Sequence, residues 1–304
     1  MYPAPPEIET HLFSRLPDDF RIEGEPNIWV TINKPGGMMD SFLEGPAFDR
    51  DGNLYCVDIP YGRVFRVSPD GEWTVAFDYD GEPNGLKIHR DGRLFIADQA
   101  HGIVVADPAT GKTEQLVTRP NLERFLGCND LVFASNGDLY FTDPGRSSLN
   151  HPTGRVFRLS AGGELELLLD GAAYPNGLVL NADESVLYVA VTLSNAIWRL
   201  PLNGGPMDRR AGLFIQMSGG LGPDGMALDT DGNMAVAHAR AGTVWLFDPI
   251  GEPVARVRSC AGLTTTNIAY GGADGKTLYI TESQTGSILT AEMPVPGRPM
   301  YSHM

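Results

Sequence analysis

The chain has 304 residues, 42% of them hydrophobic, and carries a formal net charge of −15 at pH 7. An acidic excess of this size repels nucleic-acid phosphates and anionic membrane surfaces, so we expect neither as a partner. The 36 glycines and 23 prolines exclude a helical bundle and favour many short strands joined by tight turns.

The sequence shows no signal for export or membrane insertion. Its three cysteines are widely spaced, without a CxxC pair, as is typical of reduced thiols. The first ten residues lack the basic and apolar parts of a secretory signal, and no apolar run is long enough for a transmembrane helix. We therefore expect a cytoplasmic protein that is a monomer or a small homo-oligomer.

Two segments precede the repeated part of the chain. Residues 9–16 alternate in polarity, as a strand does. Residues 17–41 are rich in proline and glycine, include Met38 and Met39, and have no counterpart among the repeats. We interpret residues 17–41 as a lid, or as a loop at the entrance to one end of the fold.

From residue 44 onward, one pattern recurs along the chain. The first copy reads Glu44-Gly45-Pro46-Ala47-Phe48 and runs through an Asp-Gly turn into Asn53-Leu54-Tyr55. The later copies open, at intervals of 40 to 48 residues, at Asn84, Asn129, Asn176, Asp224 and Thr266. This interval is the length of a four-stranded propeller blade.

The order of strands and turns within each copy also fits a blade. A third strand follows a glycine turn, as in residues 62–67 and 154–159, and a further Gly-containing turn leads to an outer strand. No long segment shows a helical period. The six copies therefore predict an all-β fold, a six-bladed β-propeller of four-stranded blades, that occupies residues 1–304 as a single domain.

A propeller must close, because an open ring leaves an exposed strand edge. Little chain remains after the last predicted strand, residues 286–291. We therefore expect residues 9–16 to supply the missing outer strand of the last blade.

The six blade-opening residues are candidates for a metal site. The first strand of each blade lines the central channel, so these residues should form a ring around the axis. All six carry oxygen, and Glu44 and Asp224 are acids. Buried carboxylates require a cation or protons to neutralise them, and carboxylate and amide oxygens suit a hard divalent ion. The absence of Cys and His from the ring disfavours a structural zinc site.

Asn-Gly and Asp-Gly pairs also occur simply as turns. We interpret the internal pairs Asp51-Gly52 and Asp91-Gly92 in that way. The blade-opening set differs, because its members precede strands in register and vary among Glu, Asn and Asp. We interpret that variation as a choice of ligands.

Four of the openings, in this order and one blade apart, resemble the senescence-marker-protein, gluconolactonase and luciferin-regenerating-enzyme family. They are Glu44-Gly45-Pro46, Asn129-Asp130, Pro175-Asn176-Gly177 and Pro223-Asp224-Gly225. The resemblance extends from about residue 42 to residue 289. Residues 129–143 are also similar to bacterial drug-responsive lactonases, and the phosphotriesterase diisopropylfluorophosphatase is a more distant relative.

The resemblance implies roles for particular residues. It implies that Glu44, Asn176 and Asp224 are ligands of one divalent ion, and that Asn129 is a further ligand or a substrate contact. It also implies that Asp224 is the catalytic residue, as general base or nucleophile. Ca²⁺ is the ion we expect, with Mg²⁺, Mn²⁺ and Zn²⁺ as alternatives.

The residues themselves add two further candidates for substrate binding, Asn84 in the ring and Arg146 in the loop after Asp143. Arg146 is equally well explained as an exposed loop arginine. The chain also departs from the sugar lactonases. Residues 17–41 exceed their short lead-in, and Gly127-Cys128 stands where they place a basic residue.

These features predict a metal-dependent hydrolase that opens the ring of a lactone, either a sugar lactone or that of another small hydroxy acid. An activated water would attack a carbonyl polarised by the ion. A serine hydrolase is disfavoured because no Gly-x-Ser-x-Gly motif is present. The alternatives are an esterase or phosphotriesterase using the same ion, and a non-catalytic ligand-binding propeller.

Overall fold

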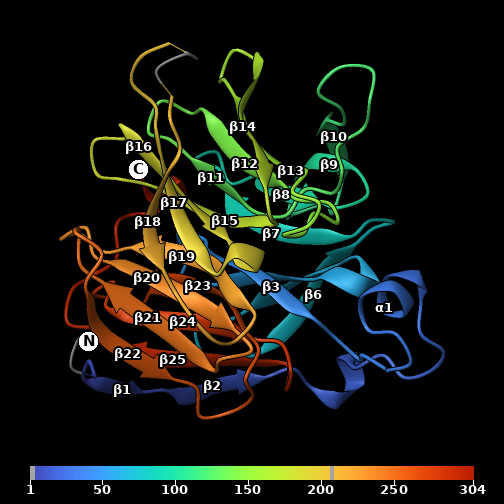
Figure 1. The fold of residues 1–304 in the computed structure, drawn as a ribbon. Coiled ribbons are helices and arrows are strands. Elements are labelled where there is room, and N and C mark those ends of the chain that lie inside the picture. Colours follow the sequence, from blue (N-terminus) through green and yellow to red (C-terminus); the bar gives the residue numbers. More distant parts are fainter. Residues whose placement is uncertain (1–3, 206–208) are drawn as a thin grey trace.

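A computed structural model describes residues 4–205 and 209–304 of the chain, and it confirms the predicted six-bladed β-propeller (Figure 1). The strands form six sheets, in which the four strands of each blade are antiparallel and are ordered from an inner strand at the axis to an outer strand at the rim. Among the described residues, no helix is long and apolar enough to cross a membrane.

The first three blades follow the chain in order. Blade 1 consists of β3 (Leu43–Phe48), β4 (Leu54–Asp58), β5 (Arg63–Val67) and β6 (Trp73–Asp78). Blade 2 consists of β7 (Pro83–Ile88), β8 (Leu94–Asp98), β9 (Gly102–Ala106) and β10 (Thr113–Val117). Blade 3 consists of β11 (Leu131–Phe133), β12 (Leu139–Asp143), β13 (Gly154–Leu159) and β14 (Leu165–Ala172).

The last three blades continue this order. Blade 4 consists of β15 (Pro175–Leu180), β16 (Val186–Val191), β17 (Ala196–Pro201) and β18 (Gly212–Gln216). Blade 5 consists of β19 (Gly222–Leu228), β20 (Met234–Ala239), β21 (Thr243–Phe247) and β22 (Pro253–Arg258). From the C-terminal part of the chain, blade 6 receives β23 (Thr265–Gly271), β24 (Thr277–Glu282) and β25 (Ser287–Glu292).

The N-terminus closes the ring, as predicted. Strand β2 (His11–Arg15) pairs antiparallel with β25 and becomes the outer strand of blade 6. Strand β1 (Glu7–Glu9), which the sequence did not predict, pairs parallel with β22 and adds a fifth strand to blade 5. Residues 7–15 therefore hold two neighbouring blades together.

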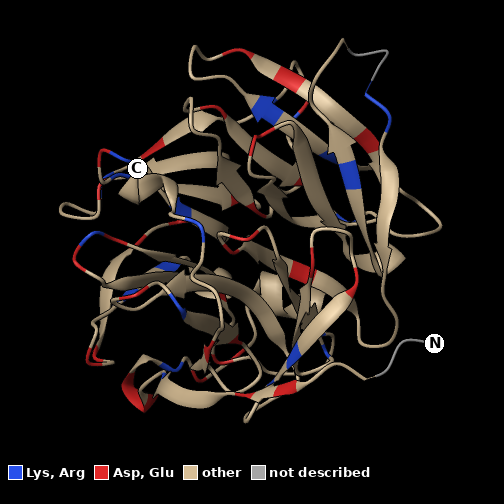
Figure 2. Cartoon of the chain, turned by 90° about the vertical axis from the view of Figure 1, so that its left-hand side faces the viewer, with Lys and Arg blue, Asp and Glu red and all other residues tan. Residues whose placement is uncertain are grey.

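The hydrophobic core is divided among the interfaces between blades. Six clusters of buried apolar side chains occur, one between each pair of adjacent blades. Charged residues lie mainly at the turns and on the outer strands, with acidic residues at many turns (Figure 2). The core therefore forms a ring of apolar interfaces around the axis, which leaves the axis free for polar groups.

Glycines allow the inner strands to approach one another closely. A Cβ atom on Gly177 would collide with the backbone of Asp224, and one on Gly225 would collide with Asn267 of the next blade. Blades 3 and 6 carry Asp130 and Asn267 at the equivalent position. Because these blades face each other across the ring, their side chains meet on the axis, where Nδ2 of Asn267 donates to Oδ2 of Asp130 at 3.2 Å.

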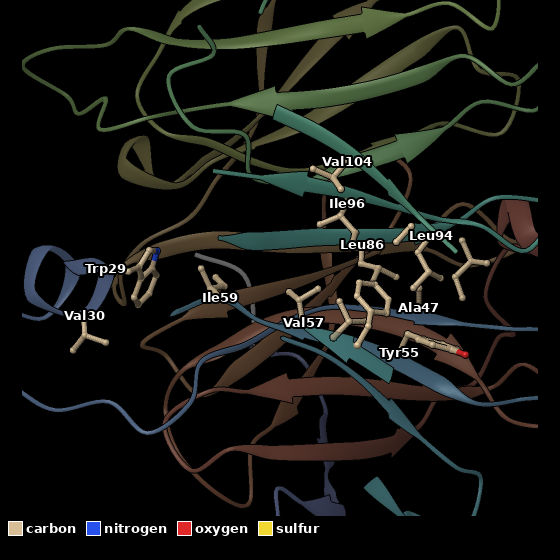
Figure 3. Close-up of a cluster of buried hydrophobic side chains, with 14 residues drawn as sticks. Trp29, Val30, Ala47, Tyr55, Val57, Ile59, Leu86, Leu94, Ile96 and Val104 are labelled. Carbon is tan, nitrogen blue, oxygen red and sulfur yellow. The ribbon is translucent and has the colours of Figure 1, made fainter. Parts of the chain in front are cut away.

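Residues 17–41 fold over one end of the ring. They contain a 3₁₀ turn, η1 (Asp18–Phe20), and a short helix, α1 (Ile28–Asn33), whose N-cap Asn27 accepts a hydrogen bond from the backbone of Val30 at 2.9 Å. Trp29 and Val30 are buried in the cluster between blades 1 and 2, which contains Ile59 (Figure 3). The segment is thus anchored by its own apolar side chains.

The C-terminal residues cross the opposite end of the channel. Tyr301, in the 3₁₀ turn η4 (Tyr301–His303), stacks on Phe133 of blade 3 with ring centroids 4.6 Å apart. Arg298 donates to the carbonyl of Leu180 in blade 4 at 2.8 Å, and Ser302 donates to that of Phe48 in blade 1 at 3.1 Å. This tail therefore ties three blades together at the end away from residues 17–41.

The close packing at the axis leads to a stability prediction. We expect Gly225→Ala to lower the free energy of unfolding by about 1–3 kcal/mol, because the new methyl group must displace Asn267. Gly212→Ala, on outer strand β18, is the matched control, since its nearest neighbour is Nε of Arg199 at 3.9 Å. Equal melting temperatures for the two variants would contradict this account of the axis.

Candidate functional site

The six blade-opening residues line one cavity, as the repeat predicted. The cavity has a volume of about 650 Å³ and lies at the end of the channel covered by residues 17–41. Its floor is formed by Glu44, Asn84, Asn129, Asn176, Asp224 and Thr266, all of which are buried. Each side chain lies at or just before the start of an inner strand, so the propeller itself brings together residues more than 200 positions apart in the sequence.

Glu44 and Asp224 are buried in the floor without a basic partner. Among the described residues, neither forms an ion pair with lysine or arginine. Burial, together with the charge of Asp130, raises the pKa of Glu44 to about 8. Burial and the charges of Glu44 and Asp130 raise the pKa of Asp224 well above its usual range. The site therefore brings together two acidic groups whose charged forms no lysine or arginine among the described residues neutralises.

Hydrogen bonds orient these carboxylates. Oε2 of Glu44 accepts from the backbone of Gly45 at 2.7 Å and from Nδ2 of Asn267 at 2.9 Å. Asp224 accepts a hydrogen bond from the side chain of Asn176. Lys87 lies deeper in the channel, with its Nζ 3.8 Å from Oδ1 of Asp130, and does not reach the floor of the cavity.

The amide side chains complete the floor. Oδ1 of Asn176 is buried and accepts no hydrogen bond within the described part of the protein. Asn129 is hydrogen-bonded to the hydroxyl of Tyr174, a buried residue with a positive φ of 66°. Because a buried amide oxygen without a partner is costly, Asn176 is suited to a ligand that accepts electron density from it.

This set of groups fits a hard divalent cation. Two unpaired carboxylates and an unpartnered amide oxygen are the ligands that such ions prefer. In residues 4–205 and 209–304, no cluster of three or more His, Cys, Asp and Glu side chains is suited to a metal, so the amides of Asn129 and Asn176 would complete the ligand set.

The other predicted residues have different positions. Asn84 lines the cavity next to Glu44, as its predicted substrate role requires. Arg146 is exposed and does not belong to the cavity lining, although its charge partly offsets the rise in the pKa of Tyr174. Thr266 donates to the carbonyl of Leu43 at 3.0 Å and so joins blade 6 to blade 1.

Apart from residues 17–41, which were expected at one end of the fold, sequence reasoning missed the cavity walls. Apolar walls come from Trp29, Met38, Met39, Phe42, Ile59, Leu193 and Leu221. Polar and basic groups come from Lys34, Gln99, Arg240 and Gln284. Many of these residues follow the second strand of a blade, at the end of the ring where the blade-opening residues lie. The turn after each second strand was therefore the signal that could have identified them.

Aspartates that follow the second strands make structural contacts. Asp58 accepts from the backbone of Phe42 at 2.7 Å and pairs with Arg63. Asp143 accepts from the backbone of Gly127 at 2.8 Å and pairs with Arg155 at 2.5 Å. These carboxylates hold the loops around the cavity and do not line it.

Fold and cavity together define a six-bladed propeller with an axial site of carboxylates and amides. Residues 42–284 match the model of the SMP-30/gluconolactonase/LRE-like region, so the chain belongs to this family.

Three similar proteins illustrate the match. A gluconolactonase of Zymomonas mobilis is 33% identical over 79% of this chain and 76% of its own length. A drp35 lactonase of Staphylococcus epidermidis is 31% identical over 86% of this chain and 78% of its own length. The solved structure of a gluconolactonase from Xanthomonas campestris has a TM-score of 0.73 and 26% identity, and covers 84% of this chain and 87% of that one.

The unpaired carboxylates predict a stability effect in protein freed of metal by a chelator. Folded Glu44 holds its proton more tightly than unfolded Glu44, so stability should fall as the pH rises from about 4.5 toward 8. We expect Glu44→Gln to reduce this fall and to raise the melting temperature at pH 8 and above.

Asp143→Asn provides the matched control, because this buried carboxylate does have a basic partner, Arg155. Its loss should destabilise the protein by roughly 3 kcal/mol. A Glu44→Gln variant that is destabilised as much as Asp143→Asn in denaturant titrations would contradict the assignment of Glu44 as an unneutralised charge.

Proposed function

We propose that this protein is a lactonase whose active site is the axial cavity. Glu44, Asn129, Asn176 and Asp224 would hold a divalent cation there, and Ca²⁺ is the ion that we expect. The observation that carries the proposal is the pair of buried carboxylates without a basic partner, next to the unpartnered Oδ1 of Asn176. The names of the relatives, gluconolactonase and lactonase, support hydrolysis of a lactone as the reaction. A bound ion would supply Lewis-acid polarisation of a carbonyl and charge stabilisation of an oxyanion.

The protein's own residues have distinct parts in this proposal. Asp224 accepts a proton from the water whose oxygen attacks the carbonyl carbon, in the role of general base. The bond between the carbonyl carbon and the ring oxygen then breaks, and the ring oxygen takes up a proton to give the hydroxy acid. Asn84 offers both a donor and an acceptor to substrate oxygens, and Tyr174 holds Asn129 in place. Residues 17–41, which line the cavity opposite its floor, limit the access of water to the site.

An activity assay with a chelator tests the proposal. We expect hydrolysis within a panel of aldonolactones and aliphatic lactones, loss of activity with chelator, and recovery when Ca²⁺, Mg²⁺, Mn²⁺ or Zn²⁺ is added back. Glu44→Gln and Asp224→Asn should each lower kcat/KM by roughly 100-fold or more, since each removes a charged ligand. An aryl ester and a phosphotriester in the same panel test the alternative hydrolase activities.

Asp40→Asn is the matched control, because Asp40 also lines the cavity but is paired with Arg21 at 2.8 Å. This variant should keep its sensitivity to the chelator and most of its activity. Full activity of Glu44→Gln and Asp224→Asn, or full activity of the wild type in excess chelator, would overturn the proposed mechanism. Failure to hydrolyse any lactone would favour a ligand-binding propeller.

A further inference from the structure

Two cationic side chains line the cavity above the ring. Lys34 is the C-cap of α1, and Arg240 lies in the turn between β20 and β21. Within the described residues, neither side chain takes part in an ion pair or a hydrogen bond. Both cations are therefore available to a bound molecule.

The remaining charges make this part of the cavity positive. Asp40 also lines it but is neutralised by Arg21 at 2.8 Å. Glu44 and Asp224 lie in the floor, where the proposed cation would neutralise them. Lys34 and Arg240 are solvent-exposed, and this uncompensated pair of cations at the edge of the cavity contrasts with the net charge of −15 of the whole chain.

The backbone at Arg240 is held in an unusual conformation. Four non-glycine residues among those described have a positive φ, and two of them, Tyr174 and Arg240, line this cavity. Such conformations persist only where the surroundings enforce them, and they concentrate at functional sites. The φ of Arg240 is 60°.

His238 enforces the turn that carries Arg240. Its Nδ1 accepts from Nε1 of Trp245 at 3.1 Å, so the proton lies on Nε2, which donates to the carbonyl of Gly219 at 2.9 Å. The carbonyl of His238 also accepts from the backbone of Ala241 at 3.1 Å. Buried between these partners, His238 fixes the place from which Arg240 projects.

Gln284 of blade 6 adds a third donor to the lining of the cavity. Lys34 belongs to α1, which packs between blades 1 and 2, whereas Arg240 and Gln284 follow the second strands of blades 5 and 6. Oε1 of Gln284 accepts from the backbone of Leu263 at 3.0 Å, which leaves its Nε2 hydrogens as donors. An ammonium, an amide donor and a guanidinium thus line the same cavity.

We propose that Arg240, together with Lys34 and Gln284, forms an anion subsite, so that the preferred substrates are lactones carrying a carboxylate group. This inference rests on the proposed function. The planar guanidinium matches a carboxylate through two parallel hydrogen bonds, and Lys34 adds charge without a fixed geometry. Trp29 and Leu221 contact the carbon skeleton from the apolar walls. A neutral lactone of the same ring size leaves this subsite unused.

The test compares two γ-lactones with the same ring, neutral γ-valerolactone and 5-oxotetrahydrofuran-2-carboxylate. We expect the wild type to prefer the carboxylate by roughly 10-fold or more in kcat/KM, mainly through a lower KM. Arg240→Gln should remove most of this preference and leave hydrolysis of the neutral lactone unchanged, while Arg240→Lys should restore part of it. Lys34→Gln should have a smaller effect in the same direction.

Arg199→Gln is the matched control, because Arg199 is exposed on β17 and does not line the cavity. It should leave the preference at the wild-type value, and melting curves should show that all variants fold. A wild type that prefers the neutral lactone, or an Arg240→Gln variant that keeps the wild-type preference, would overturn the subsite.

A binding measurement separates failure of the subsite from failure of the lactonase proposal. Calorimetry with tetrahydrofuran-2-carboxylate, a cyclic ether that cannot be hydrolysed, should show binding that Arg240→Gln weakens roughly 10- to 100-fold. Neutral tetrahydrofurfuryl alcohol should bind equally to both proteins. If no lactone is hydrolysed but this difference persists, the subsite stands and the lactonase proposal fails. If lactones are hydrolysed and the difference is absent, only the subsite fails.

Discussion

The burial of Glu44 and Asp224 at one end of the axial channel is the constraint on which the rest of the site depends. Both carboxylates are almost inaccessible to solvent, and Lys87 forms its ion pair with Asp130 and not with either of them. The propeller can support this arrangement because its stability comes from elsewhere, from six apolar interfaces between blades. The residues at the axis can therefore serve ligand binding, even where they do not stabilise the unliganded protein.

The repeat carried most of the information about the fold and the floor of the site. Its interval predicted the six blades, and the residues opening each copy predicted the ring, because a propeller places equivalent positions of every blade around one axis. Closure by residues 9–16 followed from the need to cover an exposed edge, and β2 fulfils it. These features depend on local pattern and symmetry, which a sequence displays directly.

The walls could not be predicted in the same way. Trp29 and Met38 reach the cavity only because α1 docks between blades 1 and 2, a contact between segments that share no repeat. Arg240 looks like an ordinary turn residue until its positive φ and its place at the mouth are known. The C-terminal tail showed no pattern either, since its role comes from Tyr301 meeting Phe133 of a distant blade. The inner strands thus determine the floor of the cavity, and the turns and terminal segments determine its walls and hence the ligands that it can bind.

The order of elements at the N-terminus has a consequence for how the protein matures. Strand β2 pairs with β25 from the last blade, and Arg21, a few residues later, donates to the carbonyl of Thr285 at 2.9 Å. Residues 17–41 therefore follow directly on a strand pairing that can form only after β25 has been synthesised. A ribosome-bound chain with five complete blades has neither a closed ring nor the contacts that anchor the start of residues 17–41. The cavity is thus among the last parts of the molecule to form, and an incomplete chain cannot present it.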